Sequence, residues 1–128
     1  KAPSINLRIK SLKQLTSLGW QIGLRFDPLI YNKNWKISYK ELIRTILDEI
    51  NTNYLHSVSF GSLRFPKQIF HTISNMYPGD ELFAHNFEKR DNVYSYKDEV
   101  ENEMISYCKN QIYKKVKKDV QIFTCTPY

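Results

Sequence analysis

The sequence predicts an α/β fold in which parallel strands are connected by helices. Helix-like and strand-like segments alternate in the order α-β-α-β-α over residues 1–80, an amphipathic helix separates the two strands, and glycine (4) and proline (5) are few. Strands separated by a helix pair in parallel through right-handed crossovers, as in a doubly wound sheet or a (β/α) barrel. Two or three strands cannot close a barrel, so we expect these elements to form part of a larger sheet.

The first helix is expected between Ser4 and Gly19. Ser4 can cap the helix N-terminus, leucine and isoleucine follow at mostly helical spacing, and Gly19 is suited to the C-terminal end. The first strand is expected over residues 21–27, where apolar and polar side chains alternate. Pro28 is expected to end this strand.

The next elements repeat the same order. A second helix is expected from Asn34 or Trp35 to about Ile50, because its apolar residues recur every three or four positions. Residues 56–63 alternate as a second strand. Pro66 suits the first turn of a third helix.

The C-terminal part is less regular. Residues 82–96 are expected to form a loose hairpin with a turn at Asp91 and Asn92. A last helix is expected over about residues 96–116, and residues 120–124 are expected to close as a short strand.

The length of 128 residues fits one domain. We treat residues 1–128 as a single unit. Its β/α units are expected within residues 1–80, and the hairpin, the terminal helix and the last strand within residues 81–128.

The usage of cysteine and apolar residues indicates a cytoplasmic protein. Cys108 and Cys125 are too far apart for a paired metal motif, and two cysteines without a signal peptide fit a reducing compartment. No apolar stretch approaches the roughly 18 residues that a membrane-spanning helix needs. We therefore expect no membrane partner.

The charge balance favours polyanionic partners. There are 19 lysines and arginines against 13 acidic residues, which gives a net charge of +6, and such an excess is compatible with nucleic-acid binding. The alternative is that the lysines near the C-terminus only solvate the outer face of the last helix. These are Lys109, Lys114, Lys115, Lys117 and Lys118. No phosphate-binding glycine loop or nucleophile elbow is present, which excludes standard kinase and hydrolase motifs.

Polar residues occupy one face of each predicted strand. In a (β/α) barrel such residues face the lumen, and the last of them lie at the carboxyl ends of the strands, where barrel active sites are built. Arg25, Asp27 and Arg64 are site candidates on this ground. The alternative is an ion pair between Arg25 and Asp27 on a solvated edge strand.

Two segments mix cationic and aromatic side chains. Residues 64–67 read Arg-Phe-Pro-Lys, and residues 87–96 contain Lys89, Arg90 and Tyr94. This combination can hold phosphates and stack on an unstacked base. Alternatively, the tyrosines pack the last helix on the sheet. The histidines lack acidic or cysteine neighbours at ligand spacing, so no metal site is expected at His56, His71 or His85.

Several short motifs follow one another in an order that resembles one known family. They are Ala2-Pro3 with Arg8-Ile9 and Leu12, Leu18-Gly19-Trp20-Gln21-Ile22-Gly23-Leu24-Arg25-Phe26-Asp27-Pro28-Leu29-Ile30, Asn34-Trp35 with Tyr39 and Leu42, His56-Ser57-Val58-Ser59-Phe60 with Arg64-Phe65-Pro66, Tyr77-Pro78, and Tyr94-Ser95-Tyr96-Lys97. Together they are similar to the spore photoproduct lyase family of radical S-adenosylmethionine (AdoMet) enzymes. The resemblance covers most of the chain.

The resemblance implies the C-terminal portion of a partial (β/α) TIM-type barrel with parallel strands, plus a small hairpin and a terminal helix. In that family a reduced [4Fe-4S] cluster cleaves AdoMet to a 5′-deoxyadenosyl radical. The radical abstracts hydrogen from a thymine dimer photoproduct in DNA, and the lesion reverts to two thymines.

The family's cluster-binding cysteines, in a Cys-x-x-x-Cys-x-x-Cys loop, have no counterpart in this sequence. The resemblance therefore implies that the cluster is held by a missing N-terminal part of the same protein, and that this chain alone is inactive. Phe26, Asp27 and Pro28 match the segment that lines the adenosine side of AdoMet, mainly through main-chain contacts.

The family's DNA-contacting hairpin corresponds to residues 86–96. This makes Lys89, Arg90 and Tyr94, together with Arg64, candidates for DNA binding. The hairpin is shorter here and lacks the family's glycines. Two alternatives remain open: a noncatalytic basic module that binds nucleic acid, and a radical AdoMet enzyme with a different substrate.

Overall fold

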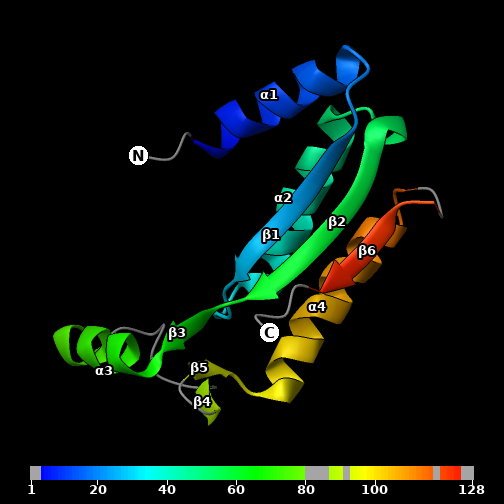
Figure 1. Cartoon of the computed structure of the whole chain (residues 1–128). Helices are drawn as coiled ribbons and strands as arrows, with labels where there is room; N and C mark the ends of the chain where they lie inside the picture. The colour runs from blue at the N-terminus through cyan, green and yellow to red at the C-terminus, as the bar shows by residue number, and fades with distance from the viewer. Residues whose placement is uncertain (1–3, 80–86, 91–92, 117–118, 125–128) are drawn as a thin grey trace.

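The computed structural model describes residues 4–79, 87–90, 93–116 and 119–124 (Figure 1). The elements follow in the order α1 (Ile5–Ser17), β1 (Ile22–Leu29), α2 (Trp35–Glu49), the short 3₁₀ helix η1 (Thr52–Tyr54), β2 (Leu55–Ser62), β3 (Arg64–Pro66), α3 (Lys67–Met76), β4 (Phe87–Arg90), β5 (Val93–Tyr96), α4 (Asp98–Tyr113) and β6 (Gln121–Thr124). The strands form two sheets, in the orders β1-β2-β6 and β3-β5-β4. The predicted α/β fold is confirmed.

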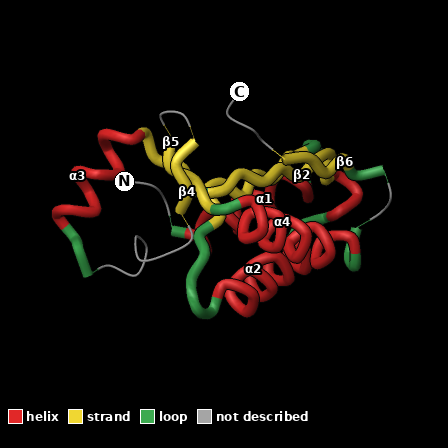
Figure 2. Tube along the Cα trace, turned by 90° about the horizontal axis from the view of Figure 1, so that it is seen from below, coloured by secondary structure: helices red, strands yellow, loops and turns green. Residues whose placement is uncertain are grey.

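The first sheet is parallel, as the alternation of helices and strands predicts. β1 pairs with β2 and β2 pairs with β6, both in parallel. α2 and α4 lie side by side on one face of this sheet (Figure 2), while α1 meets β1 near the start of the strand and diverges from it (Figure 1). The carboxyl ends of β1 and β2 lie together, at the end of the sheet from which β3 continues (Figure 1).

The hydrophobic core lies between this sheet and the two helices. Alternate strand residues point into it, so that Val58 and Phe60 of β2 are fully buried. α2 contributes Ile43 and α4 contributes Met104, and both side chains are buried at 1% exposure or less. None of the helices in the described ranges is long and apolar enough to cross a membrane.

The second sheet is small and antiparallel. β5 is its central strand and pairs with β3 on one side and β4 on the other. The expected hairpin is therefore confirmed as β4 and β5, while its expected turn at Asp91 and Asn92 lies outside the described residues. α3 projects from this end of the molecule (Figure 1).

Three element boundaries differ from the prediction. β1 does not end before Pro28 but continues to Leu29, because Pro lacks a backbone N–H and is tolerated in a strand that has a neighbour on only one side. Pro66, expected in the first turn of the third helix, instead ends the short strand Arg64–Pro66, and the helix begins at Lys67. Tyr96 belongs to β5, and the last helix begins at Asp98.

Candidate functional site

An ion pair lies at the carboxyl end of β1. Arg25 donates through Nε and Nη2 to Oδ2 of Asp27, at 3.2 and 2.9 Å. The Arg25 side chain is 65% exposed and that of Asp27 is 25% exposed. Since β1 is an edge strand in the described sheet, this geometry matches the alternative interpretation of an ion pair on a solvated edge strand.

The carboxylate of Asp27 lies against the backbone of the neighbouring strand at Gly61. A Cβ atom at position 61 would lie 2.8 Å from Cγ of Asp27, and 2.9 and 3.0 Å from its two carboxylate oxygens. These distances are shorter than van der Waals contact. Only glycine at position 61 therefore allows Asp27 to occupy this place.

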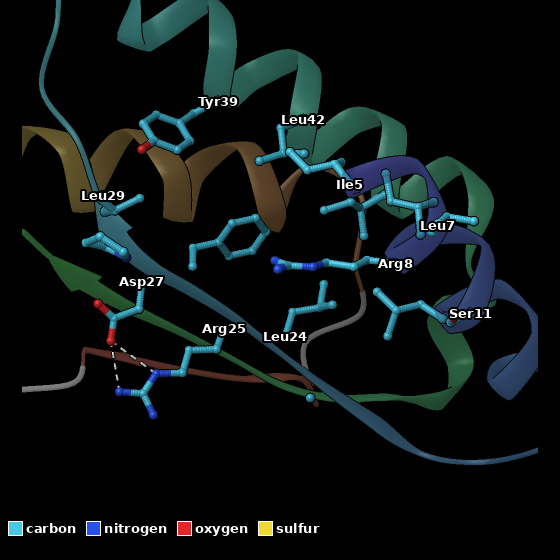
Figure 3. A pocket seen from close by; sticks show the side chains of 16 residues that line it. Ile5, Leu7, Arg8, Ser11, Leu24, Arg25, Asp27, Leu29, Tyr39 and Leu42 are labelled. Carbon is cyan, nitrogen blue, oxygen red and sulfur yellow. Dashed lines mark hydrogen bonds and ion pairs between the residues drawn. The ribbon is translucent and has the colours of Figure 1, made fainter. Parts of the chain in front are cut away.

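A cavity of about 700 Å³ lies between α1, β1 and α2 (Figure 3). Its walls are mainly apolar and include Ile5, Leu24 and Leu42. Arg8 extends into it from α1, while Asp27 lies near its lower edge in this view (Figure 3). The cavity therefore joins Arg8 of α1 to the end of β1.

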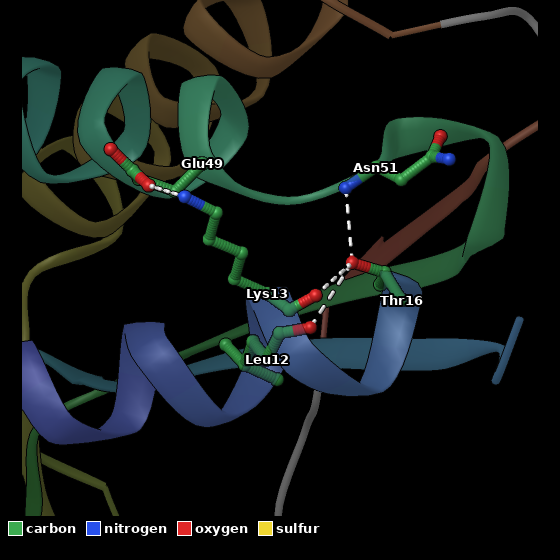
Figure 4. Close-up of polar contacts among 5 residues, drawn as sticks. All are labelled: Leu12, Lys13, Thr16, Glu49 and Asn51. Carbon is green, nitrogen blue, oxygen red and sulfur yellow. Dashed lines mark hydrogen bonds and ion pairs between the residues drawn. The ribbon is translucent and has the colours of Figure 1, made fainter. Parts of the chain in front are cut away.

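α1, which forms one wall of this cavity, is joined to the chain after α2 by a hydrogen bond of Thr16 (Figure 4). Thr16 is buried, with only 1% of its surface exposed. It lies 3.1 Å from the carbonyl oxygens of Leu12 and Lys13, to which it can donate. Its oxygen also accepts a hydrogen bond from the backbone N–H of Asn51, at 3.1 Å.

Replacing Thr16 by valine is expected to lower the free energy of unfolding by about 1–2 kcal/mol, because the N–H of Asn51 loses its partner. Urea unfolding followed by circular dichroism measures the change. Thr72→Val is the matched control, since Thr72 makes the same kind of bond to a helix carbonyl but is exposed. Equal losses in the two variants would contradict a special role for Thr16.

Two tyrosines hold the segment that follows β1. The hydroxyl of Tyr39 accepts from the N–H of Ile30, and that of Tyr96 accepts from the N–H of Tyr31, both at 2.8 Å. Burial raises the pKa of both tyrosines, and this effect is larger than the lowering caused by the two hydrogen bonds. The neutral hydroxyls therefore fix the chain just after residues 26–28.

An aromatic cluster lies between the second sheet and α3. Phe65, Phe70 and Phe87 are in mutual ring contact, and Tyr94 stacks on Phe70 with ring centroids 4.1 Å apart and planes 10° apart. The hydroxyl of Tyr94 lies 3.3 Å from Nε2 of His71. Tyr94 thus packs on α3, and not on the last helix as the packing alternative expects.

Two lysines meet beside this cluster. Lys89 pairs with Tyr94 across the hairpin, and Lys67 directly follows Pro66, which pairs with Val93. Both lysines are exposed. The pKa of Lys67 is lowered, first by a side-chain hydrogen bond with Lys89 and then by repulsion from its charge. A hydrogen bond between two amines needs one of them to be neutral, so interaction with Lys89 favours the neutral form of Lys67.

The structure separates the expected site residues into two groups. Phe26, Asp27 and Pro28 lie in β1 of the first sheet, whereas the expected DNA-binding residues lie in the second. There, Lys89 and Tyr94 are direct cross-strand partners on one face. Arg64 is the cross-strand partner of Ser95, the residue that follows Tyr94. Because side chains alternate along a strand, Arg64 lies on the opposite face of the sheet from Tyr94. The backbone of Arg90 pairs with Val93. DNA binding by these four residues stays a prediction.

Cys108 is buried in α4, and burial raises the pKa of its thiol to about 12. The thiol is therefore protonated at neutral pH, which suits a core residue. Cys125 lies outside the described residues. Within the described ranges, no three side chains of His, Cys, Asp or Glu are grouped as metal ligands.

Sequence reasoning missed three residues that shape these sites. Gly61 interrupts a strand pattern, and such a glycine is a signal of close backbone approach. Lys67 was part of a segment rich in cations and aromatics, but its proximity to Lys89 depends on the order of the second sheet. His71 carried no local signal for its contact with Tyr94.

Comparison with known families supports the resemblance seen in the sequence. The sequence model described as spore photoproduct lyase matches residues 1–124. Among curated proteins, none matches this chain. The resemblance to this family is therefore confirmed by the family match.

Solved structures with the same fold are spore photoproduct lyases. One mutant enzyme, solved with AdoMet and dinucleoside spore photoproduct bound, has a TM-score of 0.75 at 18% identity, covering 94% of this chain and 38% of that one. A second mutant with the dinucleoside photoproduct has a TM-score of 0.76 at 19% identity, covering 96% and 39%. A third enzyme, complexed with the same photoproduct, has a TM-score of 0.72 at 19% identity, with the same coverage.

At this level of identity the structural similarity establishes the fold. The matched region makes up 38–39% of each solved enzyme. This chain therefore spans less than two fifths of their length. The α/β architecture predicted from the sequence is thus the architecture of one part of these enzymes.

Proposed function

Since this chain belongs to the spore photoproduct lyase family, we propose that it forms part of a radical AdoMet lyase that repairs a thymine dimer photoproduct in DNA. The observation that carries the proposal is the family match over residues 1–124. It is supported by the solved enzymes of the same fold, which were captured with AdoMet and with the dinucleoside photoproduct. The chain would supply one wall of the cofactor site and one DNA-contacting surface.

The end of β1 has the chemistry that an adenosine or an amino acid requires. β1 has a neighbour on only one side in the described sheet, so main-chain groups of Phe26, Asp27 and Pro28 can bond to a ligand. The Asp27 carboxylate rests in the space left by Gly61, where it can accept hydrogen bonds from hydroxyl or ammonium groups. AdoMet bound there would supply the 5′-deoxyadenosyl radical.

In this proposal, the residues of this chain bind and orient. Asp27 is held by Arg25, whose Nη2 lies 2.9 Å from Oδ2 of the carboxylate. Tyr39 and Tyr96 fix the segment after β1 through their hydrogen bonds to Ile30 and Tyr31. A rigid strand end positions a bound molecule with little loss of entropy on binding.

The described residues do not fit a [4Fe-4S] cluster. Such clusters are held by cysteine thiolates, whereas Cys108 is buried with a raised pKa and no group of metal ligands is formed in the described ranges. We therefore propose that the cluster ligands belong to a part of the protein outside this chain, and we assign no chemical step to this chain through the cluster.

The second sheet is the proposed DNA surface. Its exposed Lys89 and half-buried Tyr94 are adjacent, so a cation and an aromatic ring are offered together to a phosphate and a base. Arg64 and Arg90 of the same sheet are proposed as further contacts to the phosphate backbone of DNA. The net charge of +6 supports attraction of a polyanion.

The experiment uses the product of the complete reading frame, purified without oxygen and reconstituted with iron and sulfide. AdoMet and dithionite are added, and 5′-deoxyadenosine is measured by liquid chromatography with mass spectrometry. We expect its formation, and we expect loss of spore photoproduct from ultraviolet-irradiated DNA. A fully reconstituted protein that forms no 5′-deoxyadenosine would contradict the radical mechanism. Formation without photoproduct loss would contradict only the proposed substrate.

A further inference from the structure

We propose that His71 is a positioning residue of the DNA surface, which holds the hydroxyl of Tyr94 so that this hydroxyl donates a hydrogen bond to one phosphate of a DNA strand. The inference rests on the proposed function, since it assumes that the second sheet contacts DNA. It goes further by assigning the contact to the hydroxyl of Tyr94 and by adding a residue of α3 to the surface.

The ring of Tyr94 is fixed by two consecutive residues of α3 and by the neighbouring strand. It stacks on Phe70, with centroids 4.1 Å apart and planes 10° apart. The rings of His71 and Tyr94 are nearly perpendicular, at 80°, with centroids 5.4 Å apart. Phe65 is the cross-strand partner of Tyr94 in β3. The hydroxyl is therefore directed before any ligand arrives, which reduces the entropy lost on binding.

The hydroxyl of Tyr94 lies 3.3 Å from Nε2 of His71, which is at the long end of the range for a hydrogen bond. A phenol can donate to an Nε2 that lacks a hydrogen, or accept from one that carries a hydrogen. A phosphate diester has no proton to donate, so only the second arrangement leaves the phenolic proton for it. In that arrangement the imidazole N–H polarises the phenol, and the phenol donates more strongly to the anion.

The surroundings of these two side chains favour an anion. Lys89 is the cross-strand partner of Tyr94. Lys67 lies four positions before His71 in α3, and therefore on the same side of the helix. α3 contains no acidic residue, and Glu88 lies on the opposite face of the sheet from Tyr94 because side chains alternate along β4. Since His71 and Lys89 are both exposed, a phosphate can reach this place from solvent.

Binding of a fluorescein-labelled oligothymidylate to the complete protein tests the inference. Fluorescence anisotropy is measured over a series of salt concentrations at about pH 8, where histidine side chains are ordinarily neutral. We expect Tyr94→Phe, which keeps the stacked ring, to weaken binding about tenfold, as loss of a hydrogen bond to a charged group does. His71→Leu should weaken binding by about threefold or more, because the phenol loses the group that polarises it.

Two further variants separate positioning from packing. His71→Gln can place an N–H near the position of Nε2, so it should bind within about twofold of the unchanged protein. His56→Leu is the matched control, since His56 is also exposed but begins the parallel strand β2. It should bind as the unchanged protein does.

The two residues should act as one unit. In a Tyr94→Phe background, His71→Leu should change the affinity by no more than about twofold, because the hydroxyl that it positions is already absent. The salt slope should stay the same in every variant, since neutral donors release no counterions. A fall in the slope of about 0.7 for His71→Leu would mean that a charged His71 contacts a phosphate itself, and this would overturn the positioning role.

Two other results would overturn the inference but leave the proposed DNA surface standing. One is binding by His71→Leu equal to that of the unchanged protein, and the other is an equal loss with and without the hydroxyl of Tyr94. If the unchanged protein does not bind the oligonucleotide, the DNA contact in the proposed function fails and the inference fails with it. Circular dichroism melting of each variant verifies that the substitutions leave the fold intact.

Discussion

Replacing Tyr96 by alanine is expected to lower the free energy of unfolding by about 3–5 kcal/mol, the range for removing a large buried aromatic side chain. Tyr96 is only 1% exposed. Its ring stacks on Phe87 of β4, with centroids 4.5 Å apart, while its hydroxyl binds the N–H of Tyr31 beyond β1. One side chain therefore connects the hairpin to the end of the parallel sheet, and its loss should loosen both proposed sites together.

A second substitution separates the hydroxyl from the ring. Tyr96→Phe keeps the aromatic packing but leaves the N–H of Tyr31 without its partner, which is expected to cost about 1–2 kcal/mol. Urea unfolding measures both variants, and Tyr113→Ala is the control because Tyr113 is 55% exposed. A loss for Tyr96→Ala no larger than that for the control would contradict the connecting role.

The direction in which pH changes the stability of the Tyr96→Phe variant, relative to the unchanged protein, can be predicted. Burial raises the folded-state pKa of Tyr96 above its ordinary value of 10.0. The stability contributed by the neutral hydroxyl is therefore present below about pH 10, and it decreases as the pH rises through the raised folded-state pKa. The Tyr96→Phe variant should lose less stability than the unchanged protein above pH 10, as measured by urea unfolding at each pH.

The parallel sheet could be predicted from the sequence because its signals are local. Alternation of side chains marked β1 and β2, and the apolar spacing of α2 showed that a helix crosses between them. The position of Pro28 could not be judged in the same way. Whether a strand tolerates proline depends on which of its edges is paired, and that is a property of the sheet order.

The second sheet was harder to predict because its pairing is not local. β3 has three residues and includes Pro66, so its sequence alone resembles a turn. It becomes a strand only by pairing with β5, which lies beyond α3 in the sequence. The same pairing puts Phe65, Tyr94 and Lys89 on one face of the sheet, which explains why the sequence predicted the cationic and aromatic composition but not its arrangement.

At the end of β1, too, the sequence predicted one contact of the candidate residues but not another. Alternation was sufficient to put Arg25 and Asp27 on one face, and their ion pair followed as one of two alternatives. The contact of Asp27 with Gly61 required the register of β1 against β2. A glycine within a strand indicates close approach by some group, but only the register identifies that group.

Replacing Gly61 by alanine is expected to displace the carboxylate of Asp27 and to destabilise the protein by about 1–3 kcal/mol, the usual cost of overpacking. The new Cβ would lie 2.8 Å from Cγ of Asp27, so the acid must move and its ion pair with Arg25 is disturbed. If Asp27 contributes to the cofactor site, the same variant of the complete protein should also bind AdoMet more weakly, as measured by isothermal titration calorimetry.

A double-mutant cycle attributes this cost to Asp27 itself. In an Asp27→Ala background the obstructing carboxylate is absent, so Gly61→Ala should be neutral or slightly stabilising, because alanine is favoured over glycine by about 0.5–1 kcal/mol within a strand. Gly79→Ala is the control, since a Cβ there meets no atom within 4 Å. If Gly61→Ala costs the same with and without Asp27, the two residues are not coupled and the carboxylate does not depend on the glycine for its position. A coupling of 1 kcal/mol or more, roughly the size found for residues in contact, would instead show that Gly61 places Asp27 at the end of β1.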